Sequence, residues 1–182
     1  NVKIIKGDAL KIDIRTSINA SLSKASGNWV GYKVVGNIPY YITSKLLRTI
    51  FEKWPRPKLI VLTVQKEVAQ RIVAKPPHMN LLALSVQFYS SPTIVGYVSK
   101  GSFRPIPKVD SAIIRLNPKS ETLNPKQIEE ILKLARKACA GKRKQLKNTV
   151  GGEILEKAGI RPETRPEELS LEDWLKIASE VK

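Results

Sequence analysis

The segment Val34-Val35-Gly36-Asn37-Ile38-Pro39-Tyr40-Tyr41 sets the fold predicted for the rest of this sequence. A β-branched apolar pair leads through a glycine into an Asn-x-Pro-Tyr corner. A helix is expected to begin just afterwards, with Thr43 or Ser44 as its cap. The corner therefore falls where a strand ends and a helix begins, which is where ligands bind in open α/β sheets. Pro39 fixes its own φ and keeps Ile38 extended, so the corner is stiff and its carbonyls have fixed directions.

Such a corner can hold an amino group attached to an aromatic ring. The nitrogen of that group is a poor nucleophile because its lone pair is delocalised into the ring. The Asn37 side-chain carbonyl and a backbone carbonyl near Pro39 could accept its two hydrogens and favour the tetrahedral geometry in which it reacts. Tyr40 would offer the base a flat face, a contact worth ~1–3 kcal/mol, and positioning would lower the barrier without a strong general base. A plain strand-to-helix turn explains the same four residues equally well.

Four other apolar runs predict the remainder of the sheet. Residues 1–5 predict a strand, and the unbroken apolar run 59–64 predicts a parallel strand that is buried on both faces. Helical spacing follows over 65–74. Residues 94–98 and 111–116 predict an antiparallel hairpin at the sheet edge. The pattern as a whole is that of an α/β fold.

Two of the predicted loops carry further candidate side chains. Asp8, within Gly7-Asp8-Ala9, could accept a hydrogen bond from the exocyclic amine of a cofactor adenine, or it could only cap the following turn. The connection over 101–107 contains two prolines and is therefore extended and rigid. Phe103 on this loop could close the second face of a base whose first face rests on Tyr40. The alternative is that Phe103 anchors the loop in the core.

Charge is the clearest compositional signal. The formal net charge is +16, and residues 1–149 hold 27 basic and 8 acidic residues, whereas residues 150–182 hold 5 and 8. A basic body of this kind attracts a polyanion. Nucleic acid is favoured over a membrane surface, because no strongly amphipathic Lys-rich helix with Trp and Phe on its other face is evident.

The remaining composition narrows the class of protein. With 42% hydrophobic residues the chain is globular, and no apolar run approaches the ~20 residues that span a bilayer. The single Cys139 excludes an internal disulfide, and the single His78 leaves no plausible zinc ligand set. We therefore expect a cytoplasmic protein without a metal.

The C-terminal third is predicted to be helical. Residues 117–124 have the composition of a linker, and a helix is expected to begin at Pro125. Short helices are expected over 151–182, where Ser170 and Asp173 form a capping-box pattern. Six basic side chains follow the first helix without an intervening acid, which favours phosphate contact over a merely solvated face; they are Arg136, Lys137, Lys142, Arg143, Lys144 and Lys147.

Four blocks together resemble the KsgA-type ribosomal RNA adenine dimethyltransferases, whose relatives include the Erm resistance methyltransferases. They are Gly7-Asp8-Ala9-Leu10, Asn37-Ile38-Pro39-Tyr40, Val64-Gln65-Lys66-Glu67-Val68 and Phe103-Arg104-Pro105-Ile106-Pro107-Lys108-Val109-Asp110-Ser111. The resemblance extends from residue 1 to about residue 150, and the last block is its most specific part. It implies a partial Rossmann-like class I methyltransferase domain over 1–117, whose sheet lacks its N-terminal strands, and a small helical, basic, RNA-binding domain over 118–182.

The resemblance also implies an activity, a cofactor and a set of site residues. The reaction is the transfer of methyl groups from S-adenosylmethionine to adenine N6 of small-subunit ribosomal RNA during ribosome biogenesis, by a monomer. The residues implied to bind and position the adenine are Asn37, Ile38, Pro39, Tyr40 and Phe103. Those implied to bind the cofactor are Gly7, Asp8, Ala9 and Asn37. Arg104 and Lys108 join the six basic residues above as RNA contacts.

One expected feature of this family is missing from the sequence. No G-x-G-x-x-G loop is present, and no acidic residue ends a following strand. We expect the sequence to be an N-terminally truncated piece that binds S-adenosylmethionine weakly or not at all. Three alternatives stay open: an Erm-like enzyme acting on large-subunit RNA, a DNA adenine methyltransferase, and a non-catalytic RNA-binding ribosome-assembly or transcription factor derived from the enzyme.

Overall fold

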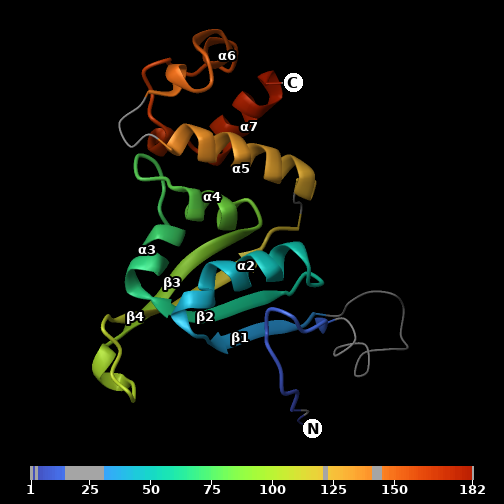
Figure 1. Cartoon of the computed structure of the whole chain (residues 1–182), viewed down its shortest axis with the longest axis vertical. Coiled ribbons are helices and arrows are strands. Elements are labelled where there is room, and N and C mark those ends of the chain that lie inside the picture. The colour runs from blue at the N-terminus through green and yellow to red at the C-terminus, as the bar shows by residue number, and fades with distance from the viewer. Residues whose placement is uncertain (1, 3, 15–30, 121–122, 141–144, 182) are drawn as a thin grey trace.

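The structure is a computed structural model that describes residues 2, 4–14, 31–120, 123–140 and 145–181. Within these residues the chain forms a four-stranded mixed sheet of order β1-β2-β4-β3 (Figure 1). Its strands are β1 (Lys33–Asn37), β2 (Leu59–Gln65), β3 (Ser90–Val98) and β4 (Ser111–Pro118). β1 and β2 are parallel, whereas β4 is antiparallel to both β2 and β3. The predicted antiparallel pair is confirmed, but β4 lies inside the sheet, so of this pair β3 alone lies at an edge.

One face of the sheet is covered by three helices. They are α2 (Thr43–Glu52), α3 (Lys66–Ile72) and α4 (Leu81–Gln87). In β2, Ile60, Leu62 and Val64 are buried in the same core cluster as apolar residues of these helices, while the residues between them are half-buried. The prediction that β2 is buried on both faces is therefore wrong. Alternate side chains of a strand point to opposite faces, and the described helices cover one of them.

The described residues of the apolar run at the start of the chain do not form the predicted strand. Val2, Ile4 and Ile5 have no strand geometry, and Val2 and Ile4 are 84% and 90% exposed. A strand requires a neighbour to accept and donate its backbone hydrogen bonds. None of the described strands pairs with these residues.

The start of α2 also differs from the sequence prediction. Neither Thr43 nor Ser44 caps the helix; Ile42 occupies the N-cap position, and the Thr43 hydroxyl donates to the Tyr40 carbonyl at 2.9 Å. The reason is that the short 3₁₀ turn η1 (Tyr40–Ile42) leads directly into α2, so Ile42 already has helical backbone angles. The corner and the helix are thus one continuous unit.

The C-terminal part is a helical layer with a core of its own. It contains α5 (Pro125–Cys139), α6 (Gly152–Lys157) and α7 (Leu171–Glu180), joined by the 3₁₀ turns η3 (Leu146–Asn148) and η4 (Pro166–Glu168). The predicted start of α5 at Pro125 is confirmed, and so is the Ser170–Asp173 capping box of α7. Trp174 of α7 is fully buried in this core.

Helix α4 connects the two layers. Ala83 and Leu84 belong to the helical core, whereas Val86 belongs to the core beneath the sheet. Figure 1 accordingly shows α4 between the sheet and α5. The division into domains at residues 117 and 118 stays a prediction, because α4 contributes to both cores. Within the part of the chain that the structure describes, no helix has both the length and the apolarity to cross a bilayer.

Candidate functional site

The Asn-x-Pro-Tyr corner leaves the carboxyl end of β1. Asn37 is the last residue of β1 and pairs with Thr63 of β2, so the corner starts from a fixed point in the sheet. The Pro39 carbonyl accepts the Ile42 N–H at 3.1 Å, which turns the chain into η1. Gly36 packs closely just before the corner: a Cβ there would lie 3.1 Å from the Ile38 side chain and 3.3 Å from that of Leu62, so these side chains would have to shift slightly to admit it.

The loop that carries Phe103 is held at both ends. Its first turn, η2 (Lys100–Ser102), is capped by the Ser99 hydroxyl, which accepts from the Gly101 N–H at 3.3 Å. At the other end, the Asp110 carboxylate accepts from the Lys100 N–H and the Asp110 carbonyl accepts from the Lys66 N–H, each at 3.0 Å. The loop is therefore tied to itself and to the start of α3.

The structure brings this loop and the corner together at one open pocket of about 290 Å³. From the corner, the lining residues are Asn37, Ile38, Pro39 and Tyr40; from the loop, they are Phe103, Arg104, Pro105 and Pro107. All five residues predicted to bind and position the adenine thus line the same cavity. Their chemical roles remain a prediction.

A hydrogen bond fixes the tyrosine of the corner. The Tyr40 hydroxyl lies 2.6 Å from Oγ of Ser111, the first residue of β4. Ser111 is fully buried, so this contact ties the phenol to the interior of the sheet. The sequence analysis placed Ser111 in a motif but assigned it no role, and only the sheet order could have revealed this contact.

The pocket has the groups that a planar base with an amino substituent requires. Asn37 and the corner backbone supply carbonyl acceptors, and Tyr40 and Phe103 supply aromatic rings. Arg104 lies at the same pocket and is exposed, so a phosphate of the same nucleotide could reach a cation there.

The predicted cofactor segment lies outside this pocket. Gly7, Asp8 and Ala9 are exposed and do not line it. Asp8 caps a turn, because its carboxylate accepts the Leu10 N–H at 2.9 Å and its carbonyl accepts from Lys11 and Ile12. This is the structural alternative that the sequence allowed. Of the four residues predicted to bind S-adenosylmethionine, Asn37 alone lines the pocket. The cofactor role of Gly7, Asp8 and Ala9 stays a prediction.

The predicted RNA contacts fall in two regions. Lys108 lines a shallow hollow of about 340 Å³ together with Lys66 and Lys100, two lysines that were not predicted to contact RNA. Arg136 and Lys137 are exposed in the last turn of α5, far along the chain from the corner. Of the other five predicted contacts, Arg104 lines the pocket at the corner and Lys147 is 3.7 Å from Glu163. The remaining three lie outside the described residues; they are Lys142, Arg143 and Lys144.

Comparison with known proteins extends over the whole chain. The profile of the ribosomal RNA adenine dimethylase family matches residues 1–182. The ribosomal RNA small subunit methyltransferase A of Dehalococcoides mccartyi (strain ATCC BAA-2266 / KCTC 15142 / 195) is 39% identical over 185 residues, which are 96% of this chain and 61% of that protein. The protein of the same name from Nostoc punctiforme is 39% identical over 199 residues, covering 100% of this chain and 67% of its own length. The chain thus spans about three fifths of the length of the first of these relatives.

Two solved structures resemble the fold. A crystal structure of a dimethyladenosine transferase from Plasmodium falciparum matches with a TM-score of 0.72 and 26% identity, over 85% of this chain and 68% of that one. A crystal structure of the 23S rRNA methyltransferase ErmE matches with a TM-score of 0.62 and 24% identity, over 92% of this chain and 78% of that one. This match shows a shared fold. The sheet, with its pocket at the carboxyl end of β1, is that of the class I methyltransferases. Within that class, the chain belongs to the ribosomal RNA adenine dimethylase family.

Proposed function

We propose that this protein takes part in the N6,N6-dimethylation of adenine in small-subunit ribosomal RNA, in the cytoplasm and as a monomer, during ribosome biogenesis. S-adenosylmethionine is the methyl donor that family membership implies. The observation that carries the proposal is the single pocket that joins Asn37 to Tyr40 with Phe103. The names of the relatives favour the small-subunit target.

In the proposed mechanism the protein binds an adenine that has left its stack, at a cost of a few kcal/mol. The ring lies between Tyr40 and Phe103. The Asn37 side-chain carbonyl and a carbonyl near Pro39 accept the two N6 hydrogens, which directs the nitrogen lone pair away from the corner. When bound, S-adenosylmethionine would supply an electrophilic sulfonium methyl group, whose bond to sulfur would break as its carbon bonds to N6. N6 would then release one proton to water.

Replacing Asn37 tests this role. With the full-length protein, Asn37→Ala should lower the methylation rate of unmodified small subunits by about 10²-fold or more, the usual cost of removing one preorganised polar contact. RNA affinity should stay within a few fold, because the rings and the cations remain. Asn148→Ala is the matched control, since Asn148 is exposed in η3 and does not line the pocket. Equal losses of rate and affinity would mean that Asn37 is structural.

The remaining alternatives are separated by the same assay. Transfer to large subunits in preference to small ones would favour the Erm-like activity. An absence of transfer with intact RNA binding would favour the non-catalytic RNA-binding protein, although the complete corner supports catalysis. DNA is disfavoured as a substrate, since the resemblance over Phe103 to Ser111 is to the RNA enzymes.

Cofactor binding by this chain is a separate question. Calorimetric titration with S-adenosylmethionine should detect weak binding or none, because the sequence lacks the G-x-G-x-x-G loop. Tight binding, abolished by Asp8→Ala, would contradict this expectation and would place the cofactor at the exposed turn.

A further inference from the structure

A second cavity lies between the sheet layer and the helical layer. Its volume is about 190 Å³, and its walls come from α2, from α4 with the following Tyr89, and from α5. Figure 1 shows these three helices side by side, with α4 between the other two along the vertical direction. We call this cavity the α2–α5 cleft. Its lining shares no residue with the pocket at the corner.

The interior of the α2–α5 cleft is apolar and aromatic. Its uncharged lining comprises Leu47, Phe51, Leu82, Val86, Tyr89 and Leu132, with the hydroxyls of Ser44 and Ser85. The rings of Phe51 and Tyr89 stack with centroids 5.1 Å apart and planes within 6°. Burial, and then the charge of Glu52, raises the pKa of Tyr89, so its phenol is neutral at physiological pH. The interior therefore suits an uncharged, flat group.

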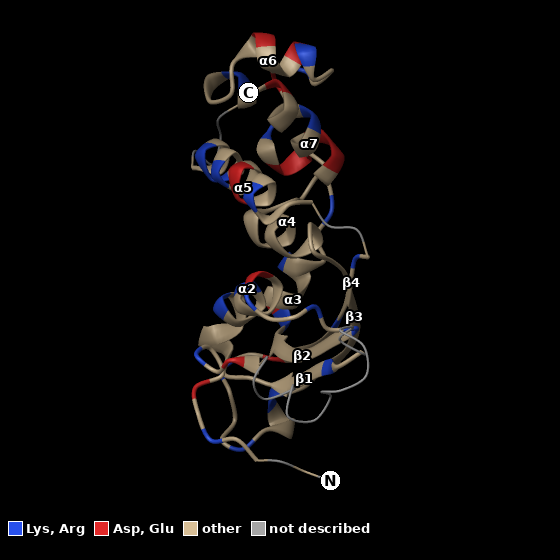
Figure 2. Cartoon of the chain, turned by 90° about the vertical axis from the view of Figure 1, so that its right-hand side faces the viewer, with Lys and Arg blue, Asp and Glu red and all other residues tan. Residues whose placement is uncertain are grey.

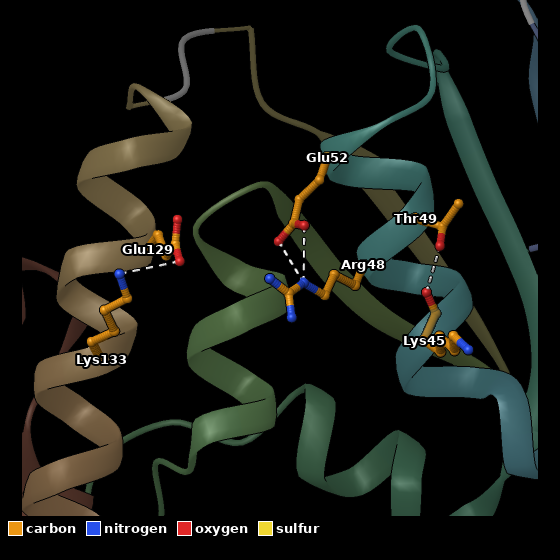
Figure 3. Close-up of polar contacts among 6 residues, drawn as sticks. All are labelled: Lys45, Arg48, Thr49, Glu52, Glu129 and Lys133. Carbon is orange, nitrogen blue, oxygen red and sulfur yellow. Dashed lines mark hydrogen bonds and ion pairs between the residues drawn. The ribbon is translucent and has the colours of Figure 1, made fainter.

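Four charged residues line the rim of the cleft, two basic and two acidic. Arg48 binds Glu52 through Nε at 2.9 Å to both carboxylate oxygens, and Lys133 lies 3.3 Å from Glu129. Figure 3 shows Arg48 on α2 and Glu129 on α5 directed into the space between the helices, each with its own partner. Arg136 is the fourth charged lining residue, and no described residue pairs with it.

We propose that the α2–α5 cleft binds one unstacked nucleotide of the RNA, with the base in the apolar interior and its phosphate on Arg136. The proposal rests on the RNA substrate assigned above and adds a second nucleotide site to it. A nucleotide combines the two properties that the cleft selects, a flat uncharged ring and one negative charge. Aromatic walls bind any base by stacking, without regard to sequence.

The surroundings of the cleft favour a strand of RNA over a free nucleotide. Lys45 is exposed one turn before Arg48 on α2, and Lys137 is exposed next to Arg136. Figure 2 shows basic residues on the left-hand side of both helices. These lysines are placed to contact the phosphates on either side of the bound nucleotide. Because α2 also begins at the corner, one helix would contact the strand at both sites.

The first test fills the cleft. Ser85→Phe places a ring in the cavity, and RNA binding should weaken about tenfold, the equivalent of one lost stacking contact. Ser179→Phe is the matched control, because both serine hydroxyls donate to the carbonyl three residues earlier in a helix and Ser179 lies outside the cleft. Equal affinity of the two folded variants would overturn the proposal.

The second test measures charge. Arg136→Ala should reduce the slope of log affinity against log salt by about one, and Arg136→Lys should restore it. Arg161→Ala, an exposed arginine in the acidic segment, should leave the slope unchanged. A slope that Arg136→Ala does not alter would overturn the phosphate contact.

The third test follows ligand binding to the wild-type chain, so it does not depend on the stability of a variant. Titration of the wild-type chain with adenosine or uridine monophosphate should shift backbone amide signals of α2, α4 and α5, whereas inorganic phosphate alone should not. Equal shifts with phosphate would mean a simple anion site and would overturn the proposal.

Saturation by the monophosphate without any effect of Ser85→Phe on RNA affinity would assign the cleft to a free nucleotide instead. A failure of the chain to bind RNA at all would instead overturn the proposed function, whereas loss of the cleft alone would leave it intact.

Discussion

Replacing Tyr40 by phenylalanine removes the hydroxyl that fixes the ring at the pocket. That hydroxyl lies 2.6 Å from Ser111 Oγ, and Ser111 is 0% exposed. Tyr40→Phe therefore leaves a buried hydroxyl without its described partner. A buried polar group left unpaired costs about 1–3 kcal/mol, and the free energy of unfolding should fall by this amount.

Replacing the partner residue, Ser111, should cost less. Ser111→Ala leaves the Tyr40 hydroxyl unpaired, but Tyr40 is only half-buried, so water can take the place of the serine. The expected loss is about 1 kcal/mol or less. The double variant lacks both hydroxyls and should be no less stable than Tyr40→Phe alone. The double-mutant cycle should therefore give a coupling energy of about 1 kcal/mol.

Urea unfolding of the wild type, the two single variants and the double variant measures this coupling. The comparison requires that m, the slope of unfolding free energy against urea concentration, is the same for all four. Additive losses, within about 0.5 kcal/mol, would refute the hydrogen bond as the contact that holds the ring. RNA binding supplies a second readout. Tyr40→Phe keeps the ring and should keep the affinity, whereas Tyr40→Ala should lose about 1–3 kcal/mol. A large loss in Tyr40→Phe would mean that the hydroxyl itself contacts RNA.

Two further predictions concern pH and capping. Burial raises the pKa of Tyr32, whose hydroxyl donates to the Pro55 carbonyl, to about 12. The folded state then holds the phenol proton more tightly than the unfolded state does. The stability that this proton contributes is complete below about pH 10 and is lost as the pH rises through the pKa of the folded state. In urea unfolding, Tyr32→Phe should flatten this loss of stability with pH. Asn80 caps α4 by accepting from the N–H groups of Leu82 and Ala83, so Asn80→Ala should lower the unfolding free energy by about 1 kcal/mol. An unchanged urea midpoint would contradict the importance of this cap.

Much of the local structure could be predicted because it depends on neighbouring residues. The corner after β1, the proline-bounded α5 and the Ser170 capping box follow from residue preferences over a few positions. The rigid Phe103 loop was also predictable, since prolines restrict the backbone wherever they occur. The candidate base pocket needed one further inference, that these two stiff segments meet, which came from the family resemblance.

The errors arose where an element depends on a distant partner. Residues 2–5 have the composition of a strand, but composition cannot supply a neighbouring strand. In β2 an unbroken apolar run suggested two buried faces, whereas the structure fully buries only alternate residues. The error at the cap of α2 was local instead, because η1 leads into the helix without a break.

The sequence by itself determined the stiff corner, the basic character of the chain and its family, because these are properties of residue type and local spacing. Tertiary structure alone decided which segments come together. It inserted β4 beside β2 and so brought Ser111 to Tyr40. It also placed α4 between two cores and left the α2–α5 cleft with Arg136 at its rim. These arrangements depend on packing between residues far apart in the chain, and no local pattern encodes such distances.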